Sequence, residues 1–193
     1  MQYKKKYIHD RLLEEGMREF LEKGYRMGNI TAIAERAEVP VGNLYRYFDG
    51  KSGLLDALVK STYKTFPELI DKLAWTEEEQ SVDIQELNEH LTQLLLNIFE
   101  QHANEMILLS EKCQGTRYED FLEKIIDQVS NLVFIKFFGQ GAKDNDRIMS
   151  KLYSKAFILN IFDVLKLGLE REKLEEIIYR LMNFYFYDIE ERR

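Results

Sequence analysis

The stretch ITAIAERAEVPVGNLYRYFDGKSGLL, residues 30–55, contains two short amphipathic segments separated by a brief turn. Apolar residues recur at helical spacing in both segments: Ile30, Ile33, Ala34 and Ala37 in the first, Leu44 and Phe48 in the second. Asn29 can cap the first helix, and Glu38-Val39-Pro40 forms the turn. We therefore expect helices over residues 30–37 and 41–47. Two short helices joined by a three- or four-residue turn are typical of a helix-turn-helix, whose second helix enters the major groove of DNA.

The second helix carries side chains suited to DNA on its outward face. That face contains Val41, Gly42, Asn43, Tyr45, Arg46 and Tyr47. An asparagine can pair bidentately with adenine, a tyrosine hydroxyl can bind phosphate, and a valine can touch a thymine methyl group. Gly42 would let the backbone approach the duplex closely.

The rest of the chain also favours helices. A first helix is expected over residues 5–23, ended by Gly24, and a long one over 53–73, with Pro67 as a kink. Further helices are expected from Ile84 through Phe99 and over 104–113, 118–138, 144–167 and 171–190. This pattern predicts an all-α protein of about nine helices. Residues 1–52 would form a three-helix DNA-binding domain, and residues 53–193 a larger helical bundle for ligand sensing and dimerisation.

Composition and charge fit this division. Hydrophobic residues make up 45% of the 193 residues and charged residues 32%, which is typical of a globular protein with a sizeable core. The net charge is −7, but residues 1–52 hold 10 Lys and Arg against 8 Asp and Glu. Residues 53–193 hold 17 against 26. An acidic body would repel DNA and help to aim the N-terminal face at it.

Several other classes of protein are disfavoured. No apolar run is long enough to span a bilayer, no signal peptide is evident, and Cys113 is the single cysteine, so we expect a cytoplasmic protein. His90 and His102 lie twelve residues apart, about 18 Å along a helix, which is too far to share a metal ion. No metal site, cofactor or nucleophile motif is predicted, and an enzyme is the weaker alternative.

Residues 7–56 resemble the N-terminal signature of the TetR family of transcriptional regulators. The resemblance lies in Phe20-Leu-Glu-Lys-Gly-Tyr25, in Ala34-Glu-Arg-Ala37, in Gly42-Asn-Leu-Tyr-Arg-Tyr-Phe48 and in the following Lys51. It implies that Asn29 lies near a phosphate, that residues 41–43 meet the groove, that Tyr45, Tyr47 and Lys51 bind the backbone, and that residues 4–6 form a basic arm. The predicted DNA contacts are thus Lys4, Lys5, Lys6, Asn29, Thr31, Val41, Gly42, Asn43, Tyr45, Tyr47 and Lys51.

The chain departs from the family pattern at two positions. Glu38 stands where the family usually has a turn glycine, and a positive φ there would cost a glutamate about 1 kcal/mol. Val41 stands where Lys or Arg is frequent, which removes one possible phosphate contact. Both changes leave open a third class of function, a ligand-binding or protein-interaction helical module that does not bind DNA.

The last two predicted helices are apolar around most of their circumference, which indicates burial on two sides. One side would face the rest of the domain and the other a second subunit, as the resemblance also implies. The predicted dimer contacts are Phe157, Ile161, Val164, Leu165, Ile178, Leu181, Met182 and Tyr185. A two-fold homodimer could place two recognition helices on a palindromic operator with half-sites about 34–36 Å apart, or a multiple of that.

The middle helices are rich in aromatic, Met and Leu residues, and the resemblance implies a small-molecule effector there. Candidate ligand contacts are Tyr63, Phe66, His90, Leu94, Met106, Cys113, Asn131 and Asn160, although for any single one of them an ordinary core role is the simpler interpretation. Asn131 and Asn160 stand out, because a buried amide needs a partner. Repression, relieved by the effector, is the role that the family most often has.

Overall fold

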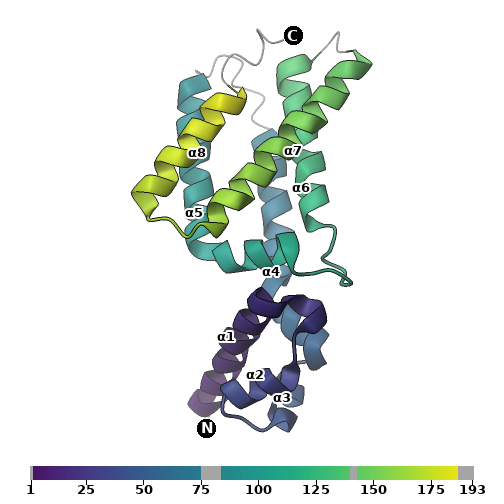
Figure 1. Cartoon of the computed structure of the whole chain (residues 1–193), viewed down its shortest axis with the longest axis vertical. Helices are drawn as coiled ribbons and strands as arrows, with labels where there is room; N and C mark the ends of the chain where they lie inside the picture. The colour runs from purple at the N-terminus through teal and green to yellow at the C-terminus, as the bar shows by residue number, and fades with distance from the viewer. Residues whose placement is uncertain (1, 75–83, 140–142, 187–193) are drawn as a thin grey trace. The chain divides into compact units, whose positions relative to one another are not determined.

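The computed structural model describes residues 2–74, 84–139 and 143–186, and these form helices with no strand (Figure 1). The α-helices are α1 (Gln2–Met27), α2 (Ile30–Arg36), α3 (Val41–Tyr47), α4 (Gly50–Ala74), α5 (Ile84–Glu111), α6 (Phe121–Val133), α7 (Asp144–Lys166) and α8 (Arg171–Phe186). A π-helical turn, η1 (Phe134–Phe138), extends α6. The all-α prediction is confirmed.

About nine helices were predicted, and the described residues contain eight α-helices. The two helices expected on either side of residue 103 run as one, α5, with a kink at His102, where φ is −136° and ψ is 20°. The predicted stop at Gly24 is real but weaker than expected. Its backbone leaves the helical region with φ of 73°, and one further turn then carries α1 to Met27.

The chain divides into two compact units. The first contains Met1–Thr65 together with Asn104–Phe121, and the second contains Phe66–Ala103 together with Leu122–Arg193. Helix α4 contributes to both units, because it continues without a break from Gly50 to Ala74. These units are defined by contacts, whereas the predicted domains, divided at residue 52, were defined by function. The predicted division therefore stays a prediction.

The core of the first unit joins all four N-terminal helices. Leu12 and Phe20 of α1, Ile33 and Ala34 of α2, Leu44 of α3 and Leu54 of α4 are completely buried. Glycines allow close packing here. A Cβ atom at Gly16 would lie 2.9 Å from Leu54 Cδ2, and one at Gly28 would lie 2.6 Å from Phe20 Cδ1. This core fixes α2 and α3 on a platform made by α1 and α4.

Residues 104–121 complete the first unit from a distant part of the sequence. The amide of Tyr25 donates a hydrogen bond of 2.8 Å to the carbonyl of Lys112. The hydroxyl of Tyr118 donates one of 2.7 Å to Asp56, and the hydroxyl of Tyr63 donates one of 2.9 Å to Asp120. These bonds tie the end of α5 and the following loop to both α1 and α4.

The second unit is built around α6, α7 and α8. Its buried side chains include Ile125 and Ile126 of α6, Ile161 and Phe162 of α7, and Ile178 and Met182 of α8. The hydroxyl of Ser150 on α7 donates a hydrogen bond of 2.8 Å to the carbonyl of Ser130 on α6, so these two helices meet through small side chains. Within the described parts of the chain, no helix combines the length and apolar character needed to cross a membrane.

Candidate nucleic-acid interface

The helix-turn-helix begins at a well-formed cap. The side-chain Oδ1 of Asn29 accepts hydrogen bonds from the amides of Thr31, at 2.8 Å, and Ala32, at 3.4 Å. Asparagine supplies this acceptor from an extended backbone, here with φ of −121°. The predicted capping role of Asn29 is confirmed, and α2 begins at the next residue, Ile30. Thr31 itself is exposed at the start of this helix.

The turn between α2 and α3 has an unusual backbone at Glu38, whose φ is +56°. A glutamate rarely adopts this left-handed conformation, because its Cβ approaches the carbonyl oxygen. Arg11 of α1 holds the turn in place. Its Nη1 lies 3.0 Å from Glu38 Oε2, and its Nη2 donates a hydrogen bond of 3.1 Å to the carbonyl of Arg36. Glu38 thus adopts the positive φ that a turn glycine would have, despite the strain, and its side chain contacts Arg11.

Helix α3 points its apolar side inward and its polar side outward. Leu44 is completely buried and Phe48 is 7% exposed, as their i, i+4 spacing predicted. Gly42, Tyr45 and Arg46 are exposed, and a Cβ atom at Gly42 would meet nothing within 4 Å. Val41, Asn43 and Tyr47 are half-buried. The exposed ridge of α3 is therefore open to a large partner.

Arg46 joins the predicted contacts on α3, although the sequence pattern indicated only that its side chain points outward. It is exposed on the same side of α3 as Gly42, four residues earlier, and it brings a cation to a helix otherwise without charge. Tyr47 lies differently from Tyr45. Its ring packs against His9 of α1, with 6.1 Å between ring centroids, which accounts for its half-buried state.

The lysines of the first unit have different surroundings. The Nζ of Lys51 donates a hydrogen bond of 3.1 Å to the carbonyl of Arg26 and lies 4.7 Å from the centre of the Tyr25 ring. Burial lowers the pKa of Lys51, and the charge of Glu19 opposes this shift. Lys5 and Lys6 are exposed, whereas the side chain of Lys4 lies outside the described part of the chain.

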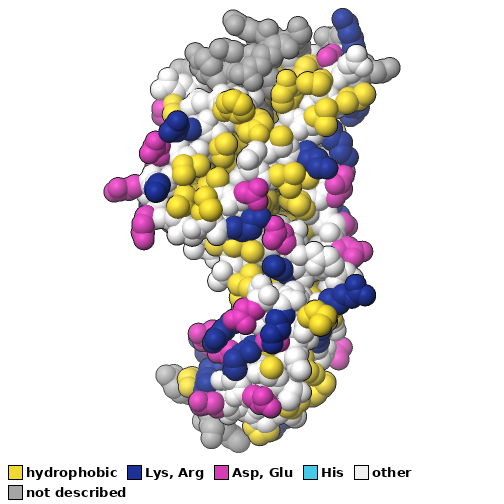
Figure 2. All heavy atoms as spheres, viewed as in Figure 1, with side chains coloured by type: hydrophobic (Ala, Val, Ile, Leu, Met, Phe, Trp, Pro, Cys, Tyr) yellow, Lys and Arg dark blue, Asp and Glu magenta, His cyan; other side chains and the backbone are white. Residues whose placement is uncertain are grey.

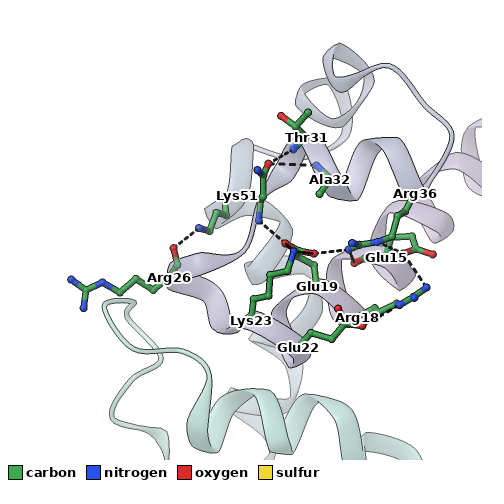
Figure 3. A network of polar contacts seen from close by, with 11 residues as sticks. Glu15, Arg18, Glu19, Glu22, Lys23, Arg26, Thr31, Ala32, Arg36 and Lys51 are labelled. Atoms are coloured by element: carbon green, nitrogen blue, oxygen red, sulfur yellow. Dashed lines mark hydrogen bonds and ion pairs between the residues drawn. The ribbon is translucent and has the colours of Figure 1, made fainter.

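A buried carboxylate connects α1 with α2 (Figure 3). Glu19 has no exposed surface, and its two oxygens accept four hydrogen bonds. Lys23 Nζ donates at 3.0 and 3.2 Å, the amide of Asn29 at 3.0 Å and Arg36 Nη2 at 2.7 Å. Burial by itself would raise the pKa of Glu19, but the bonds from Arg36, Lys23 and the Asn29 amide outweigh it and lower this pKa below its ordinary value. Arg36 Nε also donates to Glu15 at 2.8 Å.

The predicted ligand contacts are spread over both compact units. Tyr63, Met106 and Cys113 belong to the first unit, while Phe66, His90, Leu94, Asn131 and Asn160 belong to the second. Phe66, Met106 and Cys113 are buried, and Tyr63 and Leu94 are half-buried. The expectation that Asn131 and Asn160 are buried amides is wrong. Both lie on exposed faces of their helices, and Asn160 Nδ2 donates hydrogen bonds of 2.8 Å to Tyr185 Oη and to the carbonyl of Ala156.

His90 lines a groove of about 690 Å³ between α5 and α8. Glutamates dominate its walls, Glu89 from α5 and Glu172, Glu175 and Glu176 from α8, and Tyr179 adds an aromatic ring. Among the described residues, no group of three or more His, Cys, Asp or Glu side chains could hold a metal ion.

Most of the predicted dimer contacts are packed inside their own chain. Phe157, Ile161, Leu165, Ile178 and Met182 are between 0% and 7% exposed, while Val164, Leu181 and Tyr185 are half-buried. Other apolar side chains of α7 and α8 face outward, namely Ile148, Met149, Leu152, Leu159 and Phe184. Figure 2 shows hydrophobic side chains gathered over these two helices. Apolar residues surround both helices, so the sequence pattern did not distinguish the inner face from the outer one.

Comparison with known proteins identifies the N-terminal helices. Residues 12–58 match the family model described as bacterial regulatory proteins, tetR family. A curated relative from Bacillus subtilis (strain 168), named Probable HTH-type transcriptional regulator YttP, is 24% identical over 184 residues, which cover 92% of this chain and 86% of that protein.

Solved structures share the fold along nearly the whole chain. A TetR-family transcriptional regulator from Bordetella parapertussis 12822 is similar with a TM-score of 0.66 and 16% identity, over 93% of this chain and 94% of that one. The structure of a SmeT–triclosan complex is similar with a TM-score of 0.58 and 16% identity, over 92% and 90%. The match over residues 12–58 covers the capped α2, the turn and the exposed α3, so these helices form the helix-turn-helix of a DNA-binding transcriptional regulator, similar to those of the tetR family.

Proposed function

We propose that this regulator is a homodimeric repressor that binds a palindromic operator through α3 and leaves it when a small-molecule effector binds. The observation that carries the proposal is the open ridge of α3, on which Gly42, Tyr45 and Arg46 are exposed while Leu44 and Phe48 hold the helix to the core. A helix held on one side and open on the other suits insertion into the major groove.

The exposed ridge and the half-buried Asn43 beside it suggest how α3 would read DNA. Asn43, near the start of α3, would pair with a base edge, and Arg46 would bind phosphate or a guanine. Tyr45 would donate its hydroxyl to the backbone, and Gly42 would let the helix approach. Lys5, Lys6 and Lys51 would add backbone contacts, with Lys51 exchanging its bond to the Arg26 carbonyl for a phosphate. Asn29 and Thr31 would lie beside the same strand of the DNA.

The outer face of α7 and α8 supports the homodimer. Leu152 is 56% exposed, Leu159 39% and Phe184 68%, a set that is costly to leave in water. We propose that a second copy covers this face, so that the half-buried residues Val164, Leu181 and Tyr185 lie at or near the interface. The five buried residues of the predicted set would then support the interface from beneath.

The effector is proposed from the family and from the helical second unit. SmeT, a structural relative, is known in complex with triclosan, a small molecule. In this chain, the groove between α5 and α8 that contains His90 is one candidate entry for an effector. An effector releases DNA only if it binds the DNA-free conformation more tightly than the DNA-bound one.

The proposal is tested by titrating the full-length protein against DNA from upstream of its own gene, by fluorescence anisotropy at several salt concentrations, with an unrelated duplex as control. Salt-sensitive binding that prefers the upstream fragment is expected. Asn43→Ala should cost about 1–3 kcal/mol on the best site and relax the preference at one base pair. Asn97→Ala, the same change at an exposed position of α5, should change nothing. Equal affinity of Asn43→Ala and wild type would refute the assignment of Asn43.

The homodimer is tested by sedimentation of the purified chain. Leu152→Glu should shift the protein toward the monomer and weaken operator binding, because two linked heads bind far more tightly than one. Ile135→Glu is a matched control, since Ile135 is an exposed apolar residue outside α7 and α8. A wild-type monomer at micromolar concentration would contradict the proposal. Failure to bind any DNA at low salt would favour a ligand-binding or protein-interaction module.

A further inference from the structure

Helix α1 presents a stripe of charged side chains to α2 and its turn. Arg11, Glu15, Glu19 and Lys23 follow one another at four-residue intervals and so share one face of the helix. Arg11 contacts the turn at Glu38, Glu15 contacts Arg36, and Glu19 contacts both Arg36 and the residue before α2. Charged side chains at this place are unexpected, because the face of a helix that packs on its neighbour is normally apolar.

Glu19 is the one member of the stripe that binds both ends of α2. At the beginning it accepts the amide of Asn29, whose own side chain caps the helix, and at the end it accepts Nη2 of Arg36, the last helical residue. With only seven residues in α2, one carboxylate can fix the position of the whole helix on α1. Figure 3 shows Glu19 between Lys23 and Arg36.

The hydrogen bonds of Glu19 contribute more to the orientation of α2 on α1 than to the stability of the fold. Removing a carboxylate from water is unfavourable, and the attraction to Arg36 and Lys23 does little more than offset that cost. The apolar contacts of Leu12, Ile33 and Ala34 hold α1 and α2 together but resist sliding or rotation only weakly, since hydrophobic burial is not directional. Hydrogen bonds have preferred distances and angles, so they select one orientation among many of similar burial.

The orientation of α2 is passed on to α3 by the turn. The amide of Val39 donates to the carbonyl of Ala34 at 3.0 Å, and the amide of Asn43 donates to the carbonyl of Pro40 at 2.8 Å. Arg11 fixes the same turn from α1 through the carbonyl of Arg36. A rotation of α2 would therefore move the start of α3.

We infer that Glu19 is a positioning residue for operator recognition, which sets how α3 is presented to DNA by holding both ends of α2 on α1. This role rests on the proposed function of α3 as the recognition helix. Base contacts depend on sub-ångström placement, whereas phosphate contacts by flexible side chains do not. Loss of Glu19 should therefore reduce discrimination between sequences and leave non-specific binding intact.

The test compares variants on an operator selected from randomised duplexes with the wild-type, full-length protein. The double variant Glu19→Leu/Arg36→Leu replaces the completely buried Glu19 and its partner Arg36, which is 28% exposed, by apolar side chains, and it also removes the bond of Arg36 to Glu15. Replacing an ion pair by apolar side chains of similar volume is often neutral for stability. It should unfold within a few degrees of wild type, yet bind the operator about tenfold more weakly, the effect of losing one good base contact. Its affinity for an unrelated duplex at the same salt should be unchanged. Glu22→Gln, an exposed glutamate of the same helix, is the matched control and should behave as wild type.

The possible outcomes distinguish the role of Glu19 from the proposed role of α3 in DNA recognition. If the double variant is folded and keeps wild-type discrimination, the role of Glu19 is refuted. If the double variant does not fold, Glu19→Gln decides, because it preserves shape and one acceptor oxygen. A loss of operator affinity with unchanged non-specific binding supports the role, and wild-type discrimination refutes it. If the wild-type protein selects no sequence at all, recognition by α3 fails, and the role of Glu19 fails with it.

Discussion

Replacing Glu38 by glycine should make the protein more stable, although it removes a side chain that forms an ion pair. Glu38 is the only non-glycine residue with a positive φ in the described part of the chain, at +56°. A residue with a Cβ atom pays about 1–2 kcal/mol for this conformation. Glycine avoids that cost but loses about 0.5–1 kcal/mol more backbone entropy on folding. The contact with Arg11 contributes little, because the Glu38 side chain is 78% exposed.

The expected net gain for Glu38→Gly is about 0.5–1 kcal/mol, or roughly 1–4 °C in Tm for a chain of this length. Urea and thermal unfolding followed by circular dichroism would measure it. Glu38→Ala is the matched control, because it removes the same ion pair and keeps the strained Cβ atom. Glu38→Gly should be more stable than Glu38→Ala. If the two variants are equally stable, or alanine is the more stable one, the backbone at residue 38 carries no strain and the reasoning is wrong.

Three further predictions concern the first unit. Gly28→Ala should destabilise the protein by about 1–3 kcal/mol in urea unfolding, because its Cβ would lie 2.6 Å from the buried ring of Phe20; an unchanged midpoint would mean that this ring can shift freely. Burial raises the pKa of Cys113 to about 12, so a thiol reagent at pH 8 should label it only as the protein unfolds, and rapid labelling of the native protein would contradict its burial. The lowered pKa of Glu19 stabilises the fold above its ordinary value of 4.5, and this stabilisation is lost as the pH falls through the folded-state pKa. As the pH is lowered from about 5, Glu19→Gln should therefore lose less stability than wild type, and parallel curves would show that Glu19 is not the titrating group.

The features that the sequence predicted correctly are local ones. Asn29 caps α2 through its own neighbours, and Leu44 and Phe48 turn inward because they are four residues apart on one helix. Gly24 and Glu38 were identified as positions with special backbone requirements, and both have positive φ. The family signature lies in this same stretch, since a helix-turn-helix is defined by capping, spacing and turn residues within about 25 positions.

Burial of charged and apolar faces was harder to predict. Glu19 is one of five glutamates and aspartates spread along α1, and only the hydrogen bonds from Arg36 of α2 and from the Asn29 amide make its burial favourable. Similarly, Asn131 and Asn160 have apolar neighbours in the sequence but lie on the outer faces of their helices. An amphipathic pattern indicates that a face will be buried, and it is ambiguous when apolar residues surround the whole helix.

By itself, the sequence determined the helical class, the helix-turn-helix and the buried side of α3, because periodicity and turn chemistry act over a few residues. Tertiary structure alone decided that residues 104–121 pack with the first unit, through Tyr25 and Lys112 and through Asp56 and Tyr118. It also decided which sides of α7 and α8 are covered within the chain. Contacts between residues that are 60 or more positions apart cannot be predicted from periodicity. The pattern of apolar residues in a helix shows which face is buried but does not show which helix packs against that face.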